Sequence, residues 1–152
     1  MANIPDSRHT AVNRNILADT GAFVALFDPD DHWHARVAAA LAALPPDARL
    51  VTSLAIVTEV THLLDFDLRN QWAFLDWLTA GGALVRQIPP DGIAACRVQM
   101  EKYRDRPMDF ADATLIWLAE QEKITQILSI DADFEVYKIG RSKLTNLISH
   151  AR

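Results

Sequence analysis

The 152-residue sequence has one cysteine, five glycines and no apolar run long enough to cross a bilayer. The single Cys96 excludes a disulfide framework and a cysteine-rich zinc site, and it fits a reducing compartment. Basic residues are also scarce, with 15 Lys and Arg against 20 Asp and Glu, so bulk charge does not attract nucleic acid. The first residues lack the apolar centre of a secretion signal. We therefore expect a cytoplasmic protein without a membrane segment, in which a nucleic-acid role requires a local basic patch or a bound metal ion.

Hydrophobic residues make up 50% of the chain, which is enough for one continuous core in a domain of this length. Residues 1–14 are polar, contain Pro5 and show no apolar periodicity. This pattern predicts a flexible leader over 1–14 and a single domain over 15–150.

Short apolar segments alternate along the chain with longer amphipathic ones. The expected strands cover residues 16–18, 50–52, 83–85, 126–130 and 144–149. The expected helices cover about 21–27, 32–44, 54–67, 70–79, 89–104 and 109–123, with Asp31, Ser53 and Asp109 as candidate caps. Strands and helices in alternation predict an α/β domain with a mostly parallel sheet covered on both faces.

Two aspartates directly follow predicted strands, where parallel sheets bind their ligands. Asp19 lies between the apolar runs 16–18 and 22–27, and Asp131 follows the run 127–130, two residues before Asp133. A carboxylate between two buried segments needs a partner, which favours a functional site. Each aspartate is equally compatible with a simple capping or turn role.

Two further acidic residues lie on predicted helices. Glu59 falls on or beside the apolar stripe of its helix, although a solvated edge position is the commoner explanation for one Glu. Asp109 and Asp112 are spaced as the two acids of a capping box. Because Asp112 heads the core-facing stripe of its helix, we interpret Asp112 as a site residue and Asp109 as the cap.

Several carboxylates in one pocket cannot all stay ionised without a cation, because like charges raise each other's pKa. Mg²⁺ or Mn²⁺ is the expected ion, since thiolates and histidines at zinc-ligand spacing are missing. Such an ion polarises a phosphodiester and activates water, so an acidic protein can cut nucleic acid. The predicted ligands are Asp19, Glu59, Asp112 and Asp131, with Asp133 as a possible fifth.

Four segments in this order resemble a PIN domain, specifically a VapC-type toxin nuclease of a bacterial toxin–antitoxin pair. They are ILADTGAF (16–23), TEV (58–60), PMDFADATL (107–115) and LSIDADF (128–134). The family's acidic quartet falls on Asp19, Glu59, Asp112 and Asp131, and a further acid often stands at Asp133. Ser129 occupies a position where the family usually has Thr.

The resemblance implies a three-layer α/β/α sandwich and a metal-dependent endoribonuclease that hydrolyses RNA with metal-activated water. It also implies a homodimer and inhibition by a small antitoxin protein. A PIN fold that has lost catalysis and only binds RNA or protein is the alternative, and the intact quartet argues against it. A phosphatase built on Asp19 is less favoured, because Gly21 stands where such enzymes need a second Asp.

Other features admit structural explanations. Arg97, Lys102, Arg104 and Arg106 precede the acidic helix and either hold RNA phosphates or form a solvated face. The helix over 70–79 carries more aromatic bulk than one face needs, which suggests a surface for an antitoxin helix or a second copy. His32 and His34 do not share a helical face, so they are not a metal pair, and Cys96 fits a small core residue.

Overall fold

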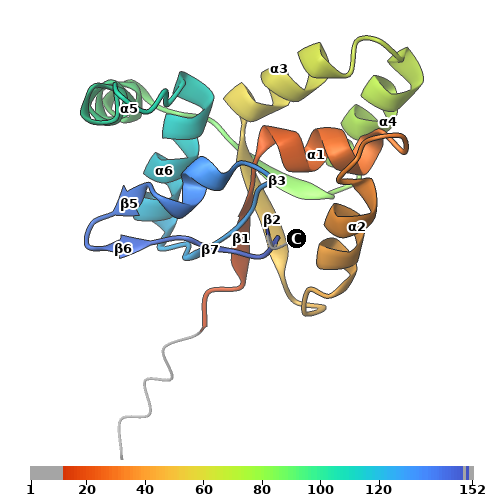
Figure 1. Ribbon diagram of the computed structural model, residues 1–152, viewed down its shortest axis with the longest axis horizontal. Coiled ribbons are helices and arrows are strands. Elements are labelled where there is room, and N and C mark those ends of the chain that lie inside the picture. Colours follow the sequence, from red (N-terminus) through yellow and green to blue (C-terminus); the bar gives the residue numbers. More distant parts are fainter. Residues whose placement is uncertain (1–11, 149, 151–152) are drawn as a thin grey trace, which may run out of the picture.

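A computed structural model describes residues 12–148 and 150, and a five-stranded parallel sheet runs through its centre (Figure 1). The strands follow the order β3-β2-β1-β4-β7, and every neighbouring pair is parallel. Their bounds are β1 Asn15–Ala18, β2 Arg49–Ser53, β3 Ala83–Arg86, β4 Gln126–Leu128 and β7 Thr145–Asn146. The predicted parallel sheet is therefore confirmed.

Helices cover both faces of this sheet, which confirms the predicted three-layer α/β/α architecture (Figure 1). Helices α1, α2 and α4 gather on one side, α5 and α6 lie on the other, and α3 contacts both α1 and α6. Their bounds are α1 Thr20–Phe27, α2 His34–Ala42, α3 Leu54–Leu63, α4 Leu68–Thr79, α5 Pro90–Lys102 and α6 Phe110–Glu122. None of the helices in the described part of the chain is long and apolar enough to cross a bilayer.

The core forms where apolar strand residues meet the helices. Ile16, Leu17 and Ala18 of β1 are almost fully buried, as expected for a central strand covered on both faces. On one face, Phe74 of α4 packs against Phe23 of α1 with ring centroids 5.3 Å apart. This packing fixes α1, and with it the residue at the end of β1.

Several boundaries differ from the sequence prediction. Strand β4 ends at Leu128 and not at residue 130, because Ser129 hydrogen-bonds outside the sheet ladder. Helix α3 ends at Leu63, since the next residues form turns. Asp31 does not cap α2; its side chain accepts from the Trp33 backbone N–H in the preceding turn. Three short elements were not predicted: the 3-10 helix η1 Ala132–Glu135 and the hairpin strands β5 Lys138–Ile139 and β6 Ser142–Lys143.

Residues 1–11 of the predicted leader lie outside the described residues, but its last residues contact the domain. The Asn13 side chain donates to the carbonyls of Glu122 and Lys123 at 2.7 and 3.0 Å. The Arg14 carbonyl accepts from the Arg49 backbone N–H at 3.2 Å. The ordered fold thus includes the residues directly before β1.

Strands β2 and β3 follow one another on one side of β1, and β4 and β7 lie on its other side. The order of the strands therefore changes direction at β1. In open parallel sheets, ligands bind outside the carboxyl ends of the strands at such a switch point. The residues that follow β1 and β4 are therefore the first place to look for a site.

Candidate active site

Asp19 lies at this switch point, directly after β1, and is only 5% exposed. One carboxylate oxygen accepts from the Thr20 backbone N–H at 2.7 Å, so Asp19 is also the cap of α1. The other oxygen accepts from the Ser129 hydroxyl at 2.9 Å. Burial raises the pKa of Asp19 to about 7; these hydrogen bonds oppose the rise and the charges of Asp131 and Glu59 add to it. The capping and site interpretations of Asp19 are thus compatible.

Asp112 lies in the first turn of α6, which the capping box with Asp109 starts. The Asp109 carboxylate accepts from the Asp112 N–H at 2.8 Å, and Asp112 Oδ2 accepts from the Asp109 N–H at 3.3 Å. Burial first, and the charges of Asp19 and Asp109 next, raise the pKa of Asp112 to about 8. Asp112 therefore completes the cap with one oxygen while its charge interacts with Asp19.

Asp131 follows β4 and caps η1, where its Oδ1 accepts from the Asp133 backbone N–H at 2.9 Å. Its own N–H donates to the Ser129 hydroxyl oxygen at 2.9 Å. Ser129 thereby links Asp19 and Asp131 through one hydroxyl group. Asp133 lies farther along η1 and is paired with Arg106 at 2.8 Å, so one of its oxygens is held by a cation of the chain itself.

Glu59 lies on α3 and is half-buried. Its pKa is raised by burial first and by the charge of Asp109 next, while the Thr20 hydroxyl lowers it. The Thr20 oxygen is buried and has no partner within hydrogen-bond geometry among the described residues. Glu59 therefore forms the edge of the site on the side of α3.

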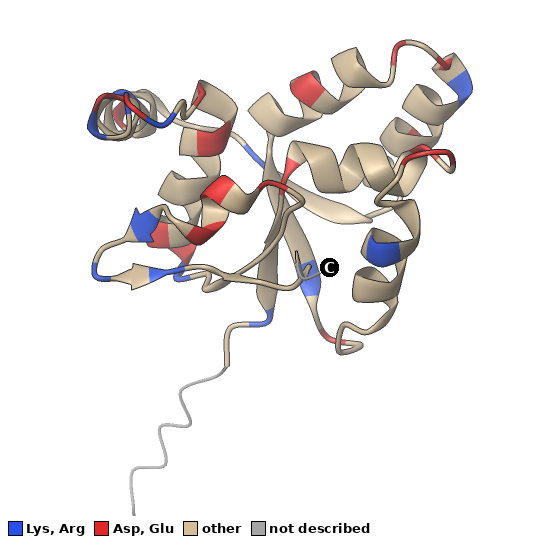
Figure 2. Ribbon diagram, in the orientation of Figure 1, with Lys and Arg blue, Asp and Glu red and all other residues tan. Residues whose placement is uncertain are grey.

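These acidic residues come from four elements far apart in the sequence and gather around one edge of the sheet (Figure 2). Asp19, Asp112 and Asp131 influence one another electrostatically, and we call these three the carboxylate cluster. No three His, Cys, Asp or Glu side chains in the described ranges are close enough to form a ready-made set of metal ligands. The cluster is thus an electrostatic group whose side chains would need to move closer together to ligate one ion.

The donor chemistry of this group fits a hard divalent cation. All its side-chain donors are oxygens, as Mg²⁺ and Mn²⁺ prefer. Burial raises the pKa values of Asp19 and Asp112 and the neighbouring carboxylates add to the rise, and a bound cation would oppose both effects. The orphaned Thr20 hydroxyl lies at the same place and is a further oxygen without a partner.

Ser129 and Tyr137 extend what sequence reasoning found. The position of Ser129 was noted from the resemblance, and the structure shows why a hydroxyl is needed there: it donates to Asp19 and accepts from Asp131. Tyr137 was missed entirely. It is fully buried, and its pKa is raised by burial first and then by the charges of Asp112, Asp133 and Asp131. A tyrosine after a short acidic turn does not indicate, from the sequence alone, that its side chain is buried beside the acidic residues.

The basic residues before α6 are mostly engaged with their neighbours. Arg97 pairs with Glu101 at 3.2 Å, and Arg104 donates to the Glu101 carbonyl. Lys102 lies over the Tyr103 ring, 5.1 Å from its centroid. Arg106 is the member of this set that pairs with a predicted site residue. Arg106 is therefore the basic residue of this set that lies beside the acidic site.

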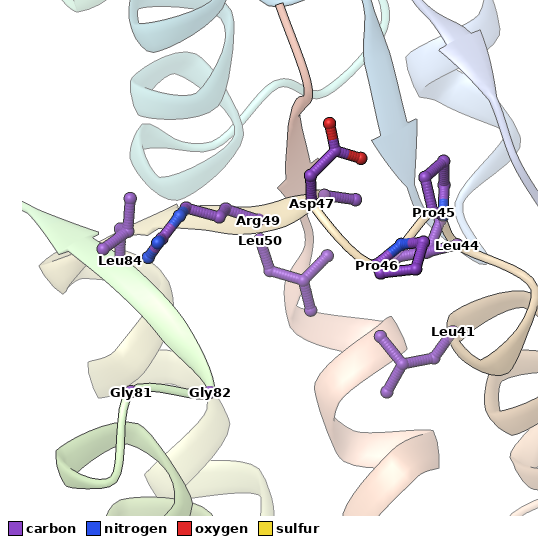
Figure 3. A pocket seen from close by; sticks show the side chains of 11 residues that line it. Leu41, Leu44, Pro45, Pro46, Asp47, Arg49, Leu50, Gly81, Gly82 and Leu84 are labelled. Atoms are coloured by element: carbon purple, nitrogen blue, oxygen red, sulfur yellow. The ribbon is translucent and has the colours of Figure 1, made fainter.

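A cavity of about 610 Å³ lies at the opposite end of the strands (Figure 3). It is lined by the loop before β2, by Leu41 of α2 and by Gly81, Gly82 and Leu84 around the start of β3. None of the predicted site residues borders it. The acidic residues lie instead at the carboxyl ends of the strands.

The model of the PIN domain family matches residues 16–140. This match covers most of the chain and includes the carboxylate cluster, so the chain belongs to the PIN domain family. The resemblance seen in the sequence is thereby confirmed. Comparison with curated proteins finds no match.

Solved structures of toxins share the fold. VapC20 of Mycobacterium tuberculosis, described as a sarcin–ricin loop cleaving toxin, matches with a TM-score of 0.73 and 22% identity over 80% of this chain and 93% of that chain. VapBC2 from Rickettsia felis, solved with a DNA fragment from its promoter, matches with a TM-score of 0.64 and 11% identity, over 87% of this chain and 98% of that chain. A toxin–antitoxin complex from Klebsiella pneumoniae matches with a TM-score of 0.58 and 18% identity, over 77% of this chain and 87% of that chain.

Proposed function

We propose that this protein is a metal-dependent endoribonuclease and the toxin of a type II toxin–antitoxin pair. The observation that carries the proposal is the carboxylate cluster, in which two aspartates at the sheet's switch point have strongly raised pKa values. Keeping a buried carboxylate without a counter-charge is costly, and such groups occur preferentially at functional sites. A divalent cation would remove the repulsion and let the carboxylates ionise.

Asp19, Glu59, Asp112 and Asp131 would hold the ion, with Asp133 available if it leaves Arg106. When bound, the ion would supply an activated water and stabilise negative charge on the scissile phosphate. Ser129 keeps Asp19 and Asp131 in fixed relative positions through its hydroxyl. Arg106 lies beside the site and would attract a phosphate of the substrate. No side chain needs to act as a nucleophile.

The proposal of RNA as substrate, an antitoxin as partner and a homodimer as the assembly rests on family membership together with the toxin structures of similar fold. The surface offers room for such partners. Along α3 and α4, five large apolar side chains are between 37% and 63% exposed: Leu63, Phe66, Leu68, Trp72 and Leu75. Exposed apolar side chains of this size do not stabilise a monomer, and their presence supports a protein partner.

Cleavage of RNA by the purified chain tests the function. A pool of structured RNA is incubated with the protein, freed of any bound partner, in Mg²⁺ or Mn²⁺ and in EDTA. We expect cleavage only with metal, and loss of at least 100-fold in Asp112→Asn. Asp65→Asn, a change of an exposed acid just after the C-terminal end of α3, is the matched control and should retain full activity.

Cleavage in EDTA, or equal cleavage by Asp112→Asn, would contradict the proposal. A folded protein that binds RNA or a protein partner but cuts no RNA in either metal would favour the catalytically silent binding module.

A further inference from the structure

The hydroxyl group of Tyr137 is buried and has no hydrogen-bond partner among the described residues. An orphaned hydroxyl in a protein interior is costly, and most buried polar groups do find a partner. Phenylalanine would fill the same space without that cost. The hydroxyl therefore calls for an explanation other than packing.

Tyr137 follows η1, which carries Asp133, and precedes β5. Its backbone N–H donates to the Asp133 carbonyl at 3.2 Å, which ties it to η1. The strand that follows it, β5, packs against α6, whose first turn carries Asp112. Its ring contacts Phe134 edge-on, with centroids 5.4 Å apart. Burial is the main cause that raises the pKa of its hydroxyl, and the charge of Asp112 is the next.

A second tyrosine in the same aromatic group provides a contrast. The Tyr103 ring lies 5.0 Å from that of Tyr137, but the Tyr103 hydroxyl oxygen accepts a hydrogen bond from the Lys138 backbone N–H at 3.0 Å. The Tyr103 oxygen is thus satisfied by the backbone. The Tyr137 oxygen, in the same surroundings, is left for another role.

Each of the three nearby carboxylates has one oxygen in a hydrogen bond, and these bonds differ in length and in donor. Asp131 Oδ1 accepts from the Asp133 N–H, and Asp133 Oδ1 is held by Arg106. Asp112 makes one long bond, from the Asp109 N–H to Oδ2 at 3.3 Å, and its Oδ1 has no partner among the described residues. The bond to Asp112 is the longest of the three, so Asp112 is the carboxylate held most weakly by the described residues.

We propose that Tyr137 is a positioning residue for the metal site: its hydroxyl donates to Asp112 when the carboxylate cluster closes on a divalent cation. This inference rests on the proposed function. A donor behind a ligating carboxylate fixes its orientation, and loss of such a donor commonly weakens metal binding 10- to 100-fold.

The test compares Tyr137→Phe with Tyr103→Phe, because each change removes one oxygen from the same aromatic group. Mn²⁺ binding to each full-length chain is measured by calorimetric titration, and the melting midpoint is measured in metal-free buffer. For Tyr137→Phe we expect an unchanged or higher metal-free midpoint and a Kd for Mn²⁺ raised 10- to 100-fold. For Tyr103→Phe we expect a lower midpoint and a Kd within threefold of the parent.

The outcomes separate this inference from the function beneath it. If the parent chain itself shows no Mn²⁺ binding, the proposed function fails and the inference fails with it. If the parent binds Mn²⁺ and Tyr137→Phe binds it equally well, only the role of Tyr137 is overturned. A metal-free midpoint lowered by Tyr137→Phe would also overturn it, because the hydroxyl would then have a structural partner before any cation binds.

Discussion

Asp19→Asn is expected to stabilise the metal-free protein while it damages the site. Asp19 is 5% exposed and its pKa is raised from 3.8 to about 7 by burial. A folded-state pKa above the unfolded value means that ionisation opposes folding. The penalty is absent below about pH 4, grows as the pH rises to about 7, and is complete above that.

The magnitude follows from the two pKa values. Their difference corresponds to about 4 kcal/mol of lost stability above pH 7, since each pKa unit is worth about 1.4 kcal/mol. Asparagine removes the charge and keeps an oxygen for the Thr20 N–H, but its amide meets the Ser129 hydroxyl less favourably. We therefore expect a net gain of about 2–4 kcal/mol at pH 8, or roughly 6–12 °C in Tm for a domain of this size.

Denaturation of parent and Asp19→Asn in chelator-treated buffer between pH 4 and pH 8 measures this effect. The two proteins should have similar stability near pH 4 and diverge as the pH rises to 7. Adding Mn²⁺ at pH 8 should raise the midpoint of the parent and have much less effect on the variant, because a ligand stabilises only the state that binds it. A variant less stable than the parent at pH 8, or a difference independent of pH, would refute the reasoning.

Three further predictions concern the surroundings of the site and the core. Ser129→Ala should cost about 1–3 kcal/mol, because Asp19 and the Asp131 N–H each lose a partner, whereas Ser129→Thr should be near neutral; equal melting of Ala and Thr variants would contradict this. Gly82→Ala should lower stability by about 1–3 kcal/mol in urea denaturation, since a Cβ there would lie 2.1 Å from the Trp77 ring; an unchanged midpoint would show that Trp77 moves freely. The Cys96 thiol is fully buried and its pKa is raised to about 11, so a thiol reagent at pH 8 should label it only on unfolding, and rapid labelling of the native protein would disprove its burial.

The layers of the fold were predictable because apolar periodicity and caps are local signals. Ser53 caps α3 through a bond to the Ile56 N–H, and Asp109 caps α6, as their spacing indicated. The short elements after β4 were not predictable. The hairpin of β5 and β6 has only two residues in each strand, and burial of Phe134 and Tyr137 holds this region in place. Such packing between distant segments leaves no period in the sequence.

Candidate site residues could be named from the sequence, but their contacts could not. Asp19 and Asp131 could be placed at strand ends, and parallel strands bring such ends to one edge. Asp133 of η1 pairs with Arg106, which lies 27 residues earlier in the chain, and no pattern in the sequence predicts this pair. The orphaned hydroxyl of Tyr137 could be recognised only once its surroundings were known.

The central claim is that the carboxylates at the switch point act as one cation-dependent nuclease site. Comparison of Asp112→Asn with Asp109→Asn tests it most directly, because both residues belong to the same capping box and asparagine is a good N-cap. Metal-dependent RNA cleavage, measured with both variants at equal folded concentration, should fall at least 100-fold for Asp112→Asn and by less than about tenfold for Asp109→Asn. Equal cleavage by the two variants would contradict the account, since Asp112 would then be no more than a helix cap.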